Sequence, residues 1–498
     1  MIVISFFIKM NKVTFRLTPF ILLILCLACR VSSKTNSQTP AQIQDPLLFP
    51  KDNYTIETVV VPTSAGEKKV TYRSYRHIPY VANPVDKDYQ SLNVSVPIKI
   101  DDVNVDAASA PILFKNGVGG YMSSNNAKTG SQANSERDRR EDLALAAGYV
   151  VVFPGSRGRD NQAADGTYYG KAPAAIVDLK AAVRYVRHNK GIIPGNTDWI
   201  VSVGCSAGGA LSALLGTSGN STLYDPYLKE IGAADADDNI YASACYSPIT
   251  DLEHADMAYE WMYGTLPTRS GQVDQEHSIQ LKNSYAAYQA SLNLQGKNNF
   301  GVLIADNYDE YLLQYYFIPS ANKFLQGLTA EKRTEYLKNN SWITWTNNSA
   351  KFSFSDYTKH AGRMKGLPAF DGFDMKVPEP ILFGNETTNA RHFTNFSLQH
   401  STGNSNAEID GGLQQVVNLM NAMYFLGPKS SSCAKYWWLR NGSKDNHTSQ
   451  TIMINLATSL ENQGRNVNTW VFWDGGHCAD EDPEGFINWI GEITGYRK

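Results

Sequence analysis

The sequence predicts an α/β fold, and three observations support this prediction. Apolar runs of strand length alternate with amphipathic helical stretches, which is typical of a parallel sheet with crossover helices. The run 149–153 is fully apolar, as central parallel strands are. A further apolar run, 199–203, leads into Gly204-Cys-Ser206-Ala-Gly208 and then into a helical pattern of small residues. Strand, Gly-x-Ser-x-Gly and helix in this order predict a nucleophile elbow at Ser206 and therefore the α/β-hydrolase fold.

The other core elements follow from periodicity. Residues 55–62 and 69–80 alternate apolar and polar side chains around Ser64-Ala-Gly66 and predict an antiparallel hairpin. We expect further strands at 92–97, 111–115, 239–248, 435–440 and 468–473, and helices at 138–147, 174–189, 413–426, 449–464 and 483–494.

A large insertion separates the last two strands from the rest of the core. Strand-like runs disappear after about residue 250, and helical stretches such as 278–294 and 309–325 take their place. We interpret residues 250–412 as a mainly helical lid domain inserted late in an α/β-hydrolase core made of residues 51–249 and 413–498. Lids of this kind are a common place for substrate selection.

The first residues have the pattern of a signal peptide, which we assign to residues 1–28. Basic residues precede an apolar run that is short for a membrane span. The run ends in Cys26-Leu-Ala-Cys29, similar to a lipobox in which Cys29 is lipidated; ordinary cleavage after Ala28 is the alternative. Residues 29–50 then form a polar tether. We expect an exported protein, either a cell-envelope lipoprotein or a secreted or periplasmic one, with a lipid anchor as its one link to the membrane.

Composition excludes some partners. The formal net charge is −3, which argues against nucleic acid or another polyanion as a ligand. No group of His, Cys or carboxylate residues has metal-ligand spacing, so we expect neither a metal nor a cofactor.

A serine nucleophile needs a base, and the base needs an acid that holds its tautomer. In α/β-hydrolases the chain order is serine, acid, histidine. The final strand leads into Asp474-Gly-Gly-His477-Cys-Ala-Asp480, so His477 is the predicted base. The acid should follow the preceding strand, where Asp445 stands, and the interval to His477 holds one crossover helix. Asp474 and Asp480 are the alternative candidates for the acid, but we interpret them as solvated loop residues.

The oxyanion hole is expected at two backbone amides. The strand 111–115 runs into a glycine cluster, Asn116-Gly-Val-Gly-Gly-Tyr121, where amides approach a ligand closely. We assign the Ala207 amide and an amide at Gly119 or Gly120 to this hole. A plain turn is the alternative for the glycine cluster.

Cysteines flank both proposed catalytic residues, with Cys205 before the serine and Cys478 after the histidine. If the serine and histidine lie within hydrogen-bonding reach, these cysteines lie close too, and a disulfide needs Cα atoms no more than about 7 Å apart. We therefore predict a Cys205–Cys478 disulfide, which an exported compartment permits. Two buried thiols are the alternative. Cys245 and Cys433 receive no role.

Several segments resemble bacterial tannases (tannin acylhydrolases), and the resemblance runs from about residue 55 to the C-terminus. The cysteine pair beside serine and histidine is also similar to the pattern of fungal tannases and feruloyl esterases. The segments are Tyr80-Val-Ala-Asn-Pro84, Leu92-Asn-Val-Ser-Val-Pro97, Gly204-Cys-Ser206-Ala-Gly208-Gly, Tyr246-Ser-Pro-Ile-Thr-Asp-Leu-Glu-His-Ala-Asp-Met-Ala-Tyr-Glu-Trp261, Pro368-Ala-Phe-Asp-Gly372 and Asp445 with His477.

This resemblance implies hydrolysis of galloyl or related phenolic-acid esters. It also implies that Lys365 and Glu379 in the lid bind adjacent phenolic hydroxyls, since an ammonium and a carboxylate read such groups as acceptor and donor. The family has an aspartate two residues after the catalytic one, where this chain has His447. Because of this departure, feruloyl or hydroxybenzoate esters are the alternative substrates.

We therefore expect an exported serine carboxylic-ester hydrolase that works through an acyl-enzyme. A serine peptidase would share the catalytic residues, but no β domain of propeller length precedes them. A non-catalytic binding module on the same scaffold is the second rival, and the complete set of catalytic residues argues against it.

Overall fold

The computed structural model describes residues 45–125, 136–427 and 431–496. From Pro46 onward these residues belong to one compact unit. The predicted signal peptide, residues 1–28, and Cys29 lie outside the described residues, as does most of the tether. None of the helices in the described part is long and apolar enough to cross a membrane.

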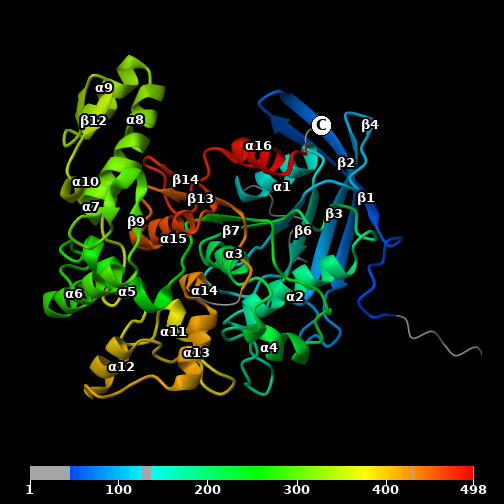
Figure 1. The fold of residues 1–498 in the computed structure, drawn as a ribbon, viewed down its shortest axis with the longest axis horizontal. Coiled ribbons are helices and arrows are strands. Elements are labelled where there is room, and N and C mark those ends of the chain that lie inside the picture. The colour runs from blue at the N-terminus through cyan, green and yellow to red at the C-terminus, as the bar shows by residue number, and fades with distance from the viewer. Residues whose placement is uncertain (1–44, 126–135, 428–430, 497–498) are drawn as a thin grey trace, which may run out of the picture. The chain divides into compact units, whose positions relative to one another are not determined.

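The core is one mixed sheet, to which ten strands contribute within the described residues (Figure 1). The order is β1-β2-β3-β6-β5-β7-β8-β13-β14, and β4 pairs with β3. The neighbouring strands from β6 to β14 run parallel, whereas β1, β2 and β3 pair antiparallel and β3 is antiparallel to β6. The strands are β1 Thr55–Thr63, β2 Gly66–Pro79, β3 Ser91–Ile100, β4 Val103–Asn104, β5 Ile112–Lys115, β6 Val150–Pro154, β7 Ile200–Cys205, β8 Ala242–Tyr246, β13 Tyr436–Gly442 and β14 Asn466–Phe472.

Helices cover both faces of this sheet. Alternate residues of a strand point to opposite faces, so each buried strand packs against helices on both sides. Ile112 and Phe114 of β5 join one apolar cluster with α2, α3 and α15, whereas Leu113 joins another with α1 and α16. The expected α/β-hydrolase fold is confirmed. The core helices are α1 Glu136–Ala146, α2 Ala174–His188, α3 Ala207–Thr217, α4 Asp225–Glu230, α13 Gly411–Leu419, α14 Ala422–Leu426, α15 Gln450–Asn462 and α16 Pro483–Thr494, with a 3-10 turn at Thr222–Tyr224.

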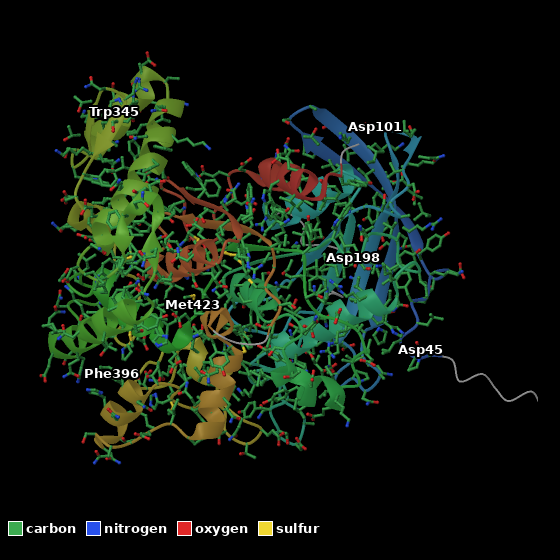
Figure 2. All side chains as sticks on the ribbon, viewed as in Figure 1. Asp45, Asp101, Asp198, Trp345, Phe396 and Met423 are labelled. Carbon is green, nitrogen blue, oxygen red and sulfur yellow. A yellow bond between two sulfur atoms is a disulfide. The ribbon has the colours of Figure 1, made fainter. Side chains whose placement is uncertain are left out.

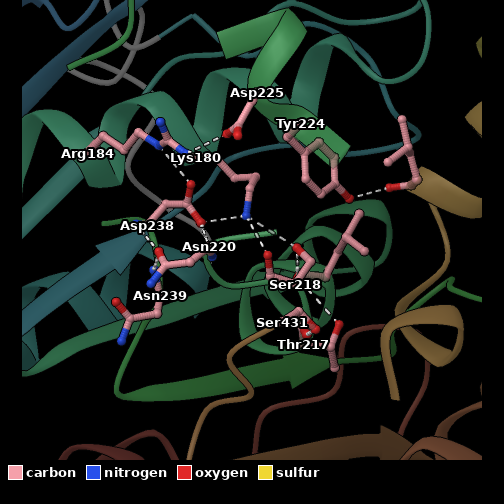
Figure 3. A network of polar contacts seen from close by, with 12 residues as sticks. Lys180, Arg184, Thr217, Ser218, Asn220, Tyr224, Asp225, Asp238, Asn239 and Ser431 are labelled. Carbon is pink, nitrogen blue, oxygen red and sulfur yellow. Dashed lines mark hydrogen bonds and ion pairs between the residues drawn. The ribbon is translucent and has the colours of Figure 1, made fainter. Parts of the chain in front are cut away.

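A buried ion pair fixes two of these helices to the sheet (Figure 3). Lys180 of α2 and Asp238, which precedes β8, are both fully buried with their charged atoms 2.7 Å apart. Lys180 Nζ also donates to the Ser218 carbonyl at the end of α3, and Arg184 Nε donates to Asp238. Burial lowers the pKa of Lys180, while the charges of Lys180 and Arg184 outweigh the burial of Asp238 and lower its pKa. Removing Asp238 would leave Lys180 as an uncompensated buried charge, which costs about 3–5 kcal/mol.

The insertion between β8 and α13 is mainly helical, as expected, and is drawn in green and yellow in Figure 1. Two short hairpins inside it escaped the prediction because their strands are two or three residues long, below the length at which alternation is visible. Its elements are α5 Leu252–Tyr263, α6 Gln275–Ser291, β9 Gln295–Gly296, a 3-10 turn at Lys297–Asn299, β10 Gly301–Val302, α7 Tyr308–Leu312, a π turn at Leu313–Phe317, α8 Ile318–Gly327, α9 Ala330–Asn339, β11 Thr344–Thr346, β12 Ser349–Lys351, α10 Phe354–Ala361, α11 Pro378–Leu382 and α12 Asn395–Thr402.

The helix expected at 413–426 is in fact two helices. Asn421 leaves the helical conformation and caps α14 by accepting a hydrogen bond from the Met423 amide. Asparagine competes with backbone hydrogen bonding in this way, which the apolar periodicity of the segment concealed. The lid boundaries at 250 and 412 stay a prediction.

Candidate active site

Ser206 stands at the turn between β7 and α3 with φ 61° and ψ −124°, a backbone conformation that costs a side-chain-bearing residue free energy. The two flanking glycines permit this turn. A Cβ atom on Gly204 would collide with the Gly208 carbonyl, and one on Gly208 would lie 2.5 Å from Asn116 Oδ1. Strain and close approach therefore coincide at the residue that the elbow motif predicted.

Asp445 and His477 lie at the ends of neighbouring strands and share a hydrogen bond. Asp445 follows β13 and is fully buried, His477 follows β14, and Asp445 Oδ2 lies 3.0 Å from His477 Nδ1. Burial opposes ionisation of Asp445, but the hydrogen bond and charge of His477 outweigh it and lower the pKa of this carboxyl. A carboxylate on Nδ1 leaves the other ring nitrogen able to take a proton.

The two alternative acids are engaged elsewhere, so the expectation that they are solvated loop residues was wrong. Asp474 accepts hydrogen bonds from His360 Nε2 and the Tyr336 hydroxyl, both at 2.7 Å and both from the lid. The buried Asp480 carboxylate lies 2.7 Å from Arg140 Nε. All three partners, His360, Tyr336 and Arg140, lie far away in sequence, which is why local composition suggested solvation.

A disulfide joins the elbow to the histidine loop. Cys205 and Cys478 are bonded, with Cα atoms 5.8 Å apart. A ring nitrogen of His477 lies within 4.8 Å of both sulfur atoms, which places the imidazole beside the residue preceding Ser206. Within the described residues no hydrogen bond joins the Ser206 hydroxyl to His477. Such bonds are often long in ligand-free sites. Cys245 and Cys433 are free thiols.

The predicted oxyanion-hole amides lie on two segments that bond to each other. Ala207 is the first residue of α3, so its amide has no partner within the helix. Gly119 and Gly120 are exposed in the loop after β5, and the space in front of Gly119 is open. The Gly208 amide donates to the Val118 carbonyl at 3.0 Å, which fixes the glycine loop beside the elbow.

Lys365 and Glu379 come from separate parts of the lid and act electrostatically on each other. Burial lowers the pKa of Lys365, although the charges of Glu379, Asp256 and Asp445 oppose this change. Burial raises the pKa of Glu379, whose Oε2 is buried with no hydrogen-bond partner among the described residues. A cavity of about 420 Å³ opens beside Lys365, lined by residues 365–369, 372–374, 377 and 378. An unpaired buried carboxyl oxygen is costly unless a ligand donates to it.

His447 lies flat against His477. The two imidazole rings are 3.9 Å apart between centroids and inclined by 6°. Burial and the charges of His477 and Lys365 lower the pKa of His447, against the opposing charge of Asp445. The structure therefore brings His447 to the same place as His477, Asp445 and Lys365.

Sequence reasoning missed two residues that hold the site together. The Tyr259 hydroxyl accepts hydrogen bonds from the Met364 and Lys365 amides and donates to the Asn446 carbonyl, which joins the lid loop to the Asp445 loop. Asn116 Nδ2 donates to the Gly208 carbonyl and to Ser212 Oγ, which joins the glycine loop to α3. Both act across long sequence intervals, and no local pattern reports such contacts. Figure 2 draws the side chains of the described residues as sticks on the ribbon.

Comparison with known proteins identifies relatives of nearly the whole described chain. A Fusobacterium nucleatum tannase structure is 36% identical, with a TM-score of 0.79 over 90% of this chain and 99% of that one. Tannin acyl hydrolase structures in complex with 3,4-dihydroxybenzoate and with ethyl gallate are each 35% identical, with the same TM-score and coverage.

Sequence comparison adds an esterase family. Residues 117–300 match the family described as BD-FAE. Esterase LipQ of Mycobacterium tuberculosis is 40% identical over 90 residues, which are 18% of this chain and 20% of that protein. The chain thus spans about a fifth of this relative's length.

Proposed function

The chain belongs to the bacterial tannase family, and from that premise we propose that it is an exported serine carboxylic-ester hydrolase that cleaves galloyl or related phenolic-acid esters. The observation that carries this proposal is the hydrogen bond between His477 and Asp445, with the His477 ring beside Cys205, the residue that precedes Ser206.

The proposed reaction is acyl transfer in two steps. His477, held at Nδ1 by Asp445, takes the proton of the Ser206 hydroxyl as its oxygen attacks the ester carbonyl, and then gives that proton to the departing alcohol. The Ala207 amide and the Gly119 or Gly120 amide stabilise the negative oxygen, at about 3 kcal/mol per donor. Water then attacks the acyl-enzyme by the same route and releases the phenolic acid.

We assign the phenolic ring to the side of the site that Lys365 and Glu379 line. Glu379 needs a hydrogen-bond donor for its buried oxygen, and a phenolic hydroxyl supplies one. Lys365 donates to the neighbouring hydroxyl. At the position of the family's aspartate, the third residue that contacts the phenolic ring, this chain has His447. One face of the His447 ring lies on His477, so we assign the edge of the ring to the substrate. The solved relatives with ethyl gallate and 3,4-dihydroxybenzoate support a small phenolic ligand.

Export rests on the sequence pattern of residues 1–28 and on the disulfide, which oxidising compartments favour. The lipobox-like sequence supports a lipid anchor on Cys29 of the exported protein. Metabolic labelling with a clickable fatty acid tests it: wild type should carry the label and Cys29→Ser should not. An unlabelled wild-type protein in the medium would reject the anchor.

The activity is tested with methyl gallate, methyl ferulate and a proline-linked chromogenic peptide. We expect wild type to hydrolyse one or both esters and to leave the peptide intact. Peptide cleavage alone would support a peptidase, and the absence of all three activities would support a binding module. Ferulate cleavage without gallate cleavage would favour the feruloyl esterase alternative.

A further inference from the structure

His447 and His477 form a parallel stack that the catalytic scheme above does not use. The centroids are 3.9 Å apart and the planes differ by 6°, so one imidazole covers a face of the other. His447 is half-buried and belongs to the loop that carries Asp445, whereas His477 belongs to the loop after β14.

One carboxylate holds both partners of this stack. Asp445 Oδ2 bonds to His477 Nδ1 at 3.0 Å, and Asp445 Oδ1 accepts from the His447 backbone amide at 3.1 Å. The hydrogen bond fixes one edge of the His477 ring but leaves rotation about that bond open. A flat group against the ring face removes this freedom.

The charge state of His447 suits a ring that stacks on His477. The charged groups that shift the pKa of His447 are His477, Asp445 and, from the lid, Lys365. Burial and the charges of His477 and Lys365 outweigh Asp445 and lower the pKa of His447, which favours the neutral form of its ring near pH 7. A neutral aromatic face is compatible with the imidazolium that forms on His477 during acyl transfer, whereas a protonated ring would repel it.

We propose that His447 is a positioning residue for the base: its ring, stacked on His477, holds the plane of His477 so that the free ring nitrogen faces Ser206. This inference rests on the proposed serine mechanism and adds to the substrate contact assigned to the ring edge. Displacing a reacting group by about 1 Å can cost 100-fold in rate, so loss of the His447 ring should lower kcat.

The test compares His447→Ala with His447→Phe, which restores a flat neutral ring without a titratable nitrogen. The substrates are p-nitrophenyl acetate, which has no phenolic acid, and methyl gallate. We expect His447→Ala to lower kcat on both by about 10- to 100-fold with little change in KM on the acetate ester. His447→Phe should recover most of kcat on the acetate ester and extend activity to lower pH, because residue 447 no longer gains a charge. His77→Ala, on β2, is the control for loss of a distant histidine.

Two results would overturn the inference. One is a loss confined to methyl gallate, which would mean that His447 acts on the substrate alone. The other is His447→Phe as slow as His447→Ala on the acetate ester. If His447→Ala fails to fold, the test is the rate at which a fluorophosphonate labels Ser206 in His447→Phe and in wild type. Similar labelling rates support the positioning role of the His447 ring. A labelling rate at least 10-fold lower in His447→Phe contradicts it. A wild type without esterase activity refutes the proposed function, which is a separate outcome.

Discussion

Cys205 and Cys478 are bonded across 273 residues of sequence, and each stands next to a proposed catalytic residue. The disulfide thus ties the turn that carries Ser206 to the loop that carries His477. A second restraint acts on the same loop, because the Cys478 amide donates to Ser247 Oγ at 2.9 Å. The distance between nucleophile and base is therefore set by covalent and polar contacts that lie outside the reacting groups.

Reducing this disulfide should lower both stability and rate. For the double variant Cys205→Ser with Cys478→Ser we expect a loss of about 2–5 kcal/mol in the free energy of unfolding, because the unfolded chain gains freedom. We also expect a lower kcat from a looser histidine loop. Urea unfolding and ester hydrolysis measure the two effects, and Cys433→Ser, which removes a free thiol, is the control. Unchanged kcat in the folded double variant would show that the disulfide does not position the base.

Tyr259→Phe should impair substrate binding from a distance. The variant leaves the Met364 and Lys365 amides without their acceptor, at a cost on the order of 1–3 kcal/mol in the free energy of unfolding. Because the loop that carries Lys365 is then less firmly held, we expect kcat/KM for methyl gallate to fall. Tyr263→Phe is a matched control on the same helix, since the buried Tyr263 hydroxyl has no hydrogen-bond partner in the described residues. Equal kinetics of the two variants would contradict the role given to Tyr259.

The buried carboxyl group of Asp256 should make the stability of the protein depend on pH. Burial and the charge of Asp371 raise its pKa to about 7, although the Phe370 and Asp371 amides donate to it. Since the folded pKa lies above the unfolded value of about 3.9, the stabilising contribution is full below pH 4 and is lost as pH rises through 7. Between pH 5 and 8 the Tm of wild type should fall more steeply than that of Asp256→Asn. Parallel curves would contradict this, and exposed Asp235→Asn should follow wild type.

His447→Asp should change substrate preference. A carboxylate at this position accepts a hydrogen bond from a third phenolic hydroxyl, which gallate has and ferulate lacks. We expect the ratio of kcat/KM for methyl gallate over methyl ferulate to rise relative to wild type. Because both esters share the same base, the ratio is insensitive to any change in the His477 stack. A constant or falling ratio would place the third hydroxyl elsewhere.

The sequence predicted the parts of the site that local rules determine. Gly204 and Gly208 indicate a close backbone approach, and the strand–elbow–helix order predicts Ser206 as the nucleophile without any tertiary information. Chain order led to Asp445 and His477, and the neighbouring cysteines led to the disulfide that the structure contains.

What the sequence did not reveal depends on contacts between distant segments. The bonds of Asp474 to His360 and Tyr336 cross from the core to the lid, and the His447–His477 stack needs two loops to meet. The break at Asn421 is a side-chain cap within an apolar helical pattern, so periodicity alone extended the helix through it.

The most direct test of the central claim is to trap the acyl-enzyme. Methyl gallate is mixed with enzyme, quenched in acid within a turnover, and digested for mass spectrometry. We predict one galloyl group on the peptide that contains Ser206, and neither adduct nor hydrolysis in Ser206→Ala. Unchanged ester hydrolysis by Ser206→Ala, or an adduct on a different residue, would contradict the account.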